Sequence, residues 1–209
     1  MPMPGRCQLG LRGSKGMNRT AQHQRVTSET KINIGLELDG QGKMEGTTGI
    51  AFMDHMLDLW SHHSGCDLFI DAQGDLEVDY HHTVEDLGIC LGHCINAALG
   101  DRSGIQRYAH TIIPMDESLV MVVLDFSGRP YLNYDVSFKT EKVGAFDVEL
   151  AEEFFRATAN HGRLTLHIKL LEGRNSHHIL EAMFKAFAGA VKQGVALVGK
   201  GIPSTKGLL

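Results

Sequence analysis

The hydrophobic and polar positions of this chain follow two periods, which predicts a mixture of strands and helices. Apolar residues at every second position are typical of strands with one buried face, and they recur over 30–38, 68–72, 76–80, 134–138 and 164–170. Spacings of three and four residues predict helices over 52–60, 84–98, 149–159 and 178–198. The nearly continuous apolar run 119–126 predicts a strand buried on both faces. Because strands and helices interleave and most strands have one open face, we expect an α+β fold.

The composition is that of an ordinary globular protein and argues against two kinds of partner. Apolar residues make up 43% of the 209 positions, and the formal net charge of −5 argues against nucleic-acid binding. The longest clean apolar run, 119–124, is far shorter than the roughly 20 residues of a membrane helix. Residues 1–18 lack the apolar core of a secretory signal and any periodic pattern. We therefore expect a flexible tail over 1–18 and a cytoplasmic protein without membrane contact.

Histidine is the residue type that points to chemistry. Six of the twelve histidines form adjacent pairs, at 62–63, 81–82 and 177–178. Two of these pairs begin the same pattern, His-His-x-x-Glu, at 81–85 and 177–181, and each begins a predicted helix. The flanking segments match at an offset of 98 residues, which also pairs His55 with Glu153. We interpret the chain as two duplicated halves, about 19–110 and 111–200.

The repeated pattern is suited to binding metal ions. Helix residues three and four positions apart share a face, so each glutamate lies beside both histidines of its pair. Adjacent imidazoles point about 100° apart, so they serve two ions more easily than one. Such imidazole and carboxylate donors suit Mn, Fe, Zn, Ni or Co. The candidate ligands are His55, His81, His82, Glu85, Glu153, His177, His178 and Glu181.

These residues by themselves leave several classes of function open. Paired ions also activate water in dinuclear metallohydrolases, and a metal-storage or shell-forming protein would carry similar ligands. Asp54 and Asp86 adjoin ligands in the sequence and are candidates to orient them. His23, His93 and His110 are interpreted as ordinary structural histidines.

Four longer motifs resemble the imidazoleglycerol-phosphate dehydratase family of histidine biosynthesis. They are Phe52–Leu57, His81–Asp86, Ser127–Tyr131 and Asn175–Ala182. The resemblance runs from about Arg19 to the C-terminus, so it implies one dehydratase domain over 19–209. It implies a helical layer between two four-stranded sheets, mixed or antiparallel, as in the second domain of a small-subunit ribosomal protein. It further implies a homo-oligomer, a 24-mer of octahedral symmetry, with active sites between subunits.

The resemblance also implies two Mn²⁺ ions at each active site. One ion would bind His55, His82, Glu85 and His177. The other would bind His81, Glu153, His178 and Glu181. The internal repeat exchanges these two sets. Many members of the family have histidine where this chain has Glu153, and a carboxylate is also a good ligand for Mn²⁺.

The implied reaction removes water from imidazole glycerol phosphate and yields imidazole acetol phosphate, through a metal-bound imidazolate and a diazafulvene. The resemblance makes Glu29 the first candidate for moving the proton, with His63 as the weaker candidate, and Glu181 is also assigned to catalysis. Arg107, Arg129, Lys185 and a C-terminal tail with Ser204, Thr205 and Lys206 would bind the phosphate. The implied substrate-binding residues are Glu29, His55, His63, His81, Glu85, Arg107, Arg129, His177, Lys185, Ser204, Thr205 and Lys206.

Overall fold

The computed structural model describes residues 19–209, and the tail predicted for 1–18 lies outside this range. The first half contains a four-stranded sheet in the order β1-β2-β4-β3 and two helices. Its elements are β1 (Thr20–Val26), β2 (Thr30–Glu37), β3 (Met44–Thr47), α1 (Ala51–Ser64), β4 (Asp67–Gly74) and α2 (His81–Leu99). Neighbouring strands are antiparallel except for the parallel pair β3 and β4.

The second half repeats this arrangement. Its sheet has the order β5-β6-β10-β7, again antiparallel except for the parallel pair at the β7 edge. Its elements are β5 (Tyr108–Met115), β6 (Ser118–Asp125), β7 (Tyr131–Asp135), β8 (Lys142–Val143), β9 (Phe146–Asp147), α3 (Leu150–Gly162), β10 (Thr165–Glu172) and α4 (Ser176–Gly194). Only the short β8–β9 ribbon has no counterpart among the described strands of the first half. The shared strand order confirms the duplication.

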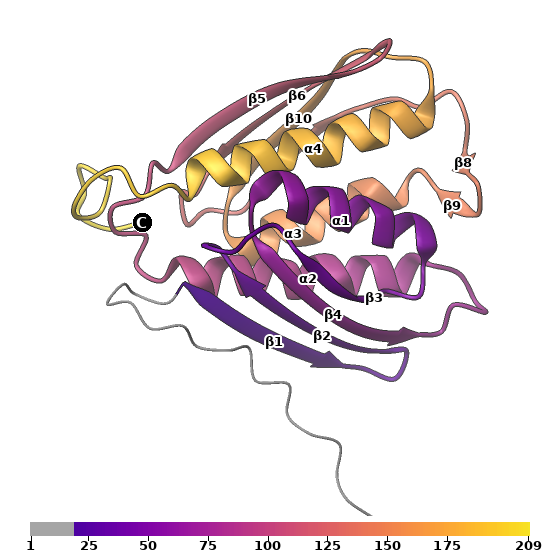
Figure 1. The fold of residues 1–209 in the computed structure, drawn as a ribbon, viewed down its shortest axis with the longest axis horizontal. Coiled ribbons are helices and arrows are strands. Elements are labelled where there is room, and N and C mark those ends of the chain that lie inside the picture. The colour runs from indigo at the N-terminus through magenta and orange to yellow at the C-terminus, as the bar shows by residue number, and fades with distance from the viewer. Residues whose placement is uncertain (1–18) are drawn as a thin grey trace, which may run out of the picture.

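The four helices lie between the two sheets (Figure 1). Helix α2 packs on β1 and β2, α4 packs on β5 and β6, and the pairs α2–α3 and α1–α4 pack against each other. Each central strand points every second residue into this layer: Ile32, Ile34 and Leu36 of β2 are almost fully buried. The α+β fold with a helical layer between two sheets is therefore confirmed, and alternation in the strands supplies its two inner faces.

Four predicted segments differ from the structure. Residues 76–80 form a turn, in which the Val78 N–H donates to the Asp75 carbonyl at 2.8 Å, and not a strand. Strand β6 is buried on one face only, because within residues 19–209 no layer covers the outer side of its sheet. The strand expected over 134–138 is β7, which ends at Asp135, where its pairing with β10 stops. Helix α4 ends at Gly194, because residues 196–199 turn to bond the 104–106 segment.

The remaining features of the described chain agree with an ordinary buried core. Cys66, Cys90 and Cys94 are buried free thiols. Burial raises the pKa of Cys90 and of Cys94 to about 12. Within residues 19–209, no helix is both long and apolar enough to cross a membrane.

Candidate metal centre and active site

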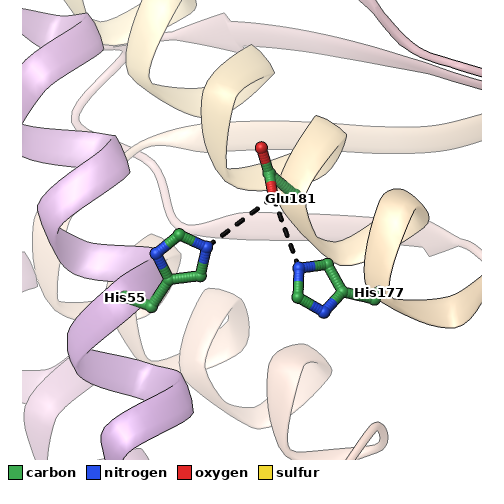
Figure 2. A group of neighbouring side chains, drawn as sticks. All are labelled: His55, His177 and Glu181. Atoms are coloured by element: carbon green, nitrogen blue, oxygen red, sulfur yellow. Dashed lines mark ion pairs between the residues drawn. The ribbon is translucent and has the colours of Figure 1, made fainter.

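Helices α1 and α4 bring together three of the predicted ligands. His55 Nε2 lies 3.7 Å and His177 Nε2 lies 3.4 Å from Glu181 Oε2. Figure 2 shows both rings directed toward this carboxylate from two different helices. One ligand atom from each residue lies within 4.8 Å of the others, and both imidazoles are partly exposed. The group therefore offers three converging donors and an open side.

Local sequence explains why α4 presents His177 and Glu181 here. The side chain of Asn175 accepts hydrogen bonds from the N–H groups of His177 and His178, which caps the helix directly before the histidine pair. Glu181 follows one turn after His177, so their side chains share a face. The capped helix start and the four-residue spacing together determine this part of the site.

Glu181 is held in its ionised form. Burial acts to raise the pKa of Glu181, but the Lys185 ammonium, 2.5 Å from Oε1, and the neighbouring imidazoles more than offset it and lower the pKa. A carboxylate with two imidazoles is a donor set that binds divalent transition ions. These residues fit a metal ion as part of its coordination sphere.

Other predicted ligands lie apart from this group. Among residues 19–209, His81, His82, Glu85, Glu153 and His178 join no cluster of three ligands. The group that does form takes His55 and His177 from one implied set and Glu181 from the other. Glu153 lies in the first turn of α3, 3.9 Å from Arg156. His161, two turns further along α3, does not take the place of Glu153 as a ligand, because it lies in a separate contact. Its Nδ1 is 3.0 Å from His93 Nε2.

His82 lies in the first turn of α2 beside two carboxylates. Its Nδ1 is 3.0 Å from Asp75 Oδ2 and 3.8 Å from Glu29 Oε2. The bond to Asp75, with support from Glu29, raises the pKa of His82. The structure thus places Glu29, expected at the substrate from the resemblance, next to a predicted ligand. Its carboxylate is half exposed and, among residues 19–209, makes only this long contact to the ring.

His178 has a corresponding carboxylate partner, Glu117, at 2.7 Å from its Nδ1. No periodic pattern in the sequence marks Asp75 or Glu117, because each lies in a turn. The two aspartates that adjoin ligands in the sequence have other partners. Asp54 accepts hydrogen bonds from Thr47 and Thr48, and Asp86 bonds Arg25 and Thr30.

Of the predicted phosphate residues, Arg107, Arg129 and the segment 204–206 lie at the other end of α4. The N–H of Arg107 donates to the Gly194 carbonyl at the end of this helix, and its guanidinium bonds Asp125 at 2.7 Å and the Pro203 carbonyl at 2.8 Å. Arg129, with a largely exposed side chain, lies 4.0 Å from the same aspartate. The segment with Ser204, Thr205 and Lys206 follows Pro203 directly.

The two groups are too far apart to bind one small substrate within one chain. Gly194 lies seventeen positions after His177 along α4, a rise of about 25 Å at 1.5 Å per residue. Lys185 and His63 lie nearer to the ligands. Burial lowers the pKa of His63 and the charge of Lys185 adds to this effect, while Glu181 opposes it.

Comparison with known proteins adds a family to this geometry. A family model described as imidazoleglycerol-phosphate dehydratase matches residues 48–191. The protein of that name from Heliobacterium modesticaldum is 56% identical over 195 residues, covering 91% of this chain and 100% of the relative. The one from Moorella thermoacetica is 51% identical, covering 92% of this chain and 100% of the relative.

Solved structures agree with the sequence relatives. The crystal structure of imidazoleglycerol-phosphate dehydratase from Staphylococcus aureus has a TM-score of 0.79 and 45% identity, covering 86% of this chain and 99% of that one. The enzyme from Pyrococcus furiosus, solved in complex with (S)-C348, has a TM-score of 0.79 and 38% identity, covering 90% of this chain and 100% of that one.

Proposed function

This chain belongs to the imidazoleglycerol-phosphate dehydratase family, hydro-lyases of histidine biosynthesis, and on that premise we propose that it converts imidazole glycerol phosphate to imidazole acetol phosphate with two Mn²⁺ ions per active site. The observation that supports a metal most directly is the convergence of His55, His177 and Glu181. A cytoplasmic location and the absence of nucleic-acid and membrane partners belong to the same proposal.

The remaining predicted ligands belong to the proposal because of where they lie on their helices. His81, His82 and Glu85 occupy the first turns of α2, and His178 lies in the first turn of α4. Bound ions supply Lewis-acid character and a template for the imidazole ring of the substrate. The protein's part is to place these imidazoles and the Glu85 carboxylate at the starts of α2 and α4.

Glu29 is our candidate for moving protons in this reaction. The carbon-bound hydrogen that is lost is not acidic, so a base acts on it only with help from the adjacent ring. Glu29 lies 3.8 Å from His82, and its half-exposed carboxylate can both take a proton and assist the departing hydroxyl. His63, near Lys185 and Glu181, is the second candidate. Glu181 is assigned to catalysis as a residue that would hold the metal ion, together with His55 and His177.

We assign the phosphate to the cationic group at the far end of α4. Arg129 is largely exposed and available for bidentate phosphate binding. Arg107 anchors the segment 203–206 through the Pro203 carbonyl, which places Ser204, Thr205 and Lys206 beside it. Lys185 pairs with Glu181 and adds positive charge near the ligands. The residues at the far end of α4 together neutralise a phosphate dianion and order the tail around it.

The separation of about 25 Å between the ligands and the phosphate group supports an active site shared between subunits. A second copy of the chain would supply the phosphate residues to the ligand group of the first, in a homo-oligomer. We propose the 24-mer of octahedral symmetry for this assembly. Glu153 at the start of α3 would be a ligand of the second ion and would add a negative charge there.

Mn²⁺ dependence is the test of the proposed function. We expect the protein stripped with a chelator to be inactive and to regain dehydration of imidazole glycerol phosphate with Mn²⁺. Glu181→Gln should abolish turnover, whereas Glu172→Gln, on an exposed strand end, should behave as wild type. Release of inorganic phosphate without the dehydrated product would indicate a metallohydrolase instead. More than two ions per chain without turnover would indicate metal storage.

Complementation between variants tests the shared site. His177→Gln and Arg129→Gln damage opposite ends of α4, so each variant alone should be inactive. If one site takes its metal ligands and its phosphate residues from different copies, unfolding and refolding the two variants together restores part of the activity. Activity that stays absent in mixed assemblies of confirmed composition contradicts the shared site but leaves the metal requirement untouched.

A further inference from the structure

The two hairpins that begin the sheets each place a glutamate at the same position. Glu29 directly precedes β2, and Glu117 directly precedes β6. Strands β1 and β2 occupy the same places in their sheet as β5 and β6 do in theirs. Each of these glutamates lies beside the second histidine of a His-His pair, His82 or His178. They are structural counterparts in the duplicated halves.

The two counterparts are bound in different ways. Glu117 Oε2 is 2.7 Å from His178 Nδ1, while its Oε1 accepts the Asn175 N–H at 2.7 Å and the Arg174 N–H at 3.2 Å. Within the described chain, the Glu29 carboxylate accepts no such hydrogen bonds, and the Nδ1 of His82 is bonded to Asp75 instead. Glu117 is held by its bonds to His178 and to the backbone, whereas the Glu29 carboxylate is available to a bound ligand.

We propose that Glu117 is a positioning residue, which fixes the ring of His178 so that Nε2 is the nitrogen offered to a metal ion. The inference deepens the proposed function and rests on it. A carboxylate only accepts hydrogen bonds, so Nδ1 of His178 carries the proton and Nε2 has the free lone pair. Carboxylates that hold the second nitrogen of a metal-binding imidazole in this way set its tautomer and orientation.

The same contacts place the whole helix start. Glu117 bonds the backbone at Arg174 and Asn175, and Asn175 in turn caps α4 through the N–H groups of His177 and His178. One side chain therefore ties the β5–β6 turn to both the backbone and the ring of the ligand pair. In agreement, the His178 ring and the backbone N–H of Asn175 hold the pKa of Glu117 well below its usual value.

Glu117→Gln separates this role from simple packing. The amide has the size of the carboxylate, but it accepts at one atom and donates at the other. With its oxygen toward Asn175, its NH₂ faces His178 Nδ1, which must then accept, and the ring proton moves to Nε2. With its oxygen toward His178, the NH₂ meets two backbone donors. Either arrangement weakens metal binding, by about 10- to 100-fold for a lost outer partner of this kind.

The matched control is Glu172→Gln. Glu172 is exposed and lies opposite Leu119 in the β10–β6 ladder. Its replacement by glutamine therefore removes the same charge from the same end of the sheet. Mn²⁺ affinity is measured on the full-length protein by electron paramagnetic resonance titration. We expect wild-type affinity in the control and the 10- to 100-fold loss in Glu117→Gln.

A double-mutant cycle shows whether Glu117 acts through His178. In a His178→Asn background, Glu117→Gln should cause less than a twofold further loss, because the ring it holds is gone. An equal loss in both backgrounds, or wild-type affinity in Glu117→Gln, overturns the inference. A wild-type protein that binds no Mn²⁺ overturns the proposed function as well, and so is distinguished from failure of the inference alone.

A measurement without metal tests the same point independently. In protein labelled with ¹⁵N-histidine, the His178 resonances are identified by their loss in His178→Asn. We expect protonation at Nδ1 in wild type and in Glu172→Gln, and a shift of the proton toward Nε2 in Glu117→Gln. Protonation at Nε2 in the wild-type protein would contradict the assignment of Glu117, whatever the metal affinities are.

Discussion

Gly88 lies where α2 of the first half packs against α3 of the second half. A Cβ at this position would lie 2.5 Å from the backbone oxygen of Phe154 and 2.9 Å from the Cβ of Ala157. Gly189 in α4 provides a comparison within the same protein. There the nearest atom would be a side-chain methyl group, Thr111 Cγ2, at 2.9 Å. Gly88→Ala therefore pushes against a backbone carbonyl, whereas Gly189→Ala pushes against a side chain.

The expected difference follows from two opposing terms. Replacing glycine by alanine inside a helix contributes about 1 kcal/mol of stability. Overpacking a core costs about 1–3 kcal/mol, and the upper part of this range applies to Gly88 because the Phe154 carbonyl cannot rotate away. We expect Gly88→Ala to lower the free energy of unfolding by about 1–2 kcal/mol. We expect Gly189→Ala to stay within about 0.5 kcal/mol of wild type.

Thermal unfolding at a fixed protein concentration measures this difference. For a chain of this size, 1 kcal/mol corresponds to a shift of about 2–4 °C in Tm. Holding the concentration constant matters because association stabilises the folded state. Equal Tm values for Gly88→Ala and Gly189→Ala would contradict the expected clash with the Phe154 carbonyl, since they would show that α2 and α3 can separate without cost.

Three further predictions concern charge and exposure. The bond from Arg19 lowers the pKa of Asp39, so its stabilisation is present above its ordinary pKa of 3.8 and is lost as pH falls through the lower folded value. Asp39→Asn should therefore cost about 0.5–1 kcal/mol at pH 7 and nothing in strong acid, by urea unfolding across pH. Lys185→Met removes the cation that lowers the pKa of Glu181, so Mn²⁺ binding should weaken more at pH 5 than at pH 8, by titration. Val78→Thr, in an exposed turn, should change the unfolding free energy by less than about 0.5 kcal/mol, and a larger loss would favour the strand first expected there.

Local pattern determined the elements whose residues alternate between core and solvent. The alternation of β2 and the helical spacing of α3 appear directly in the sequence, because one face of each is buried. Strand β1 was not predicted, because its inward-facing positions include His23 and Arg25, which are only partly buried. A strand whose inner face is polar carries no hydrophobic period, so only its pairing with β2 identifies it.

The duplication and the residue types of the candidate metal ligands follow from the sequence alone, because both are properties of order and spacing along the chain. Which of these candidates meet depends on how the helices pack. His55 and Glu181 are distant in sequence and converge because α1 packs on α4. Asp75 and Glu117 likewise reach their imidazoles from turns. Contacts between separate elements depend on how whole layers pack, and no local period records that.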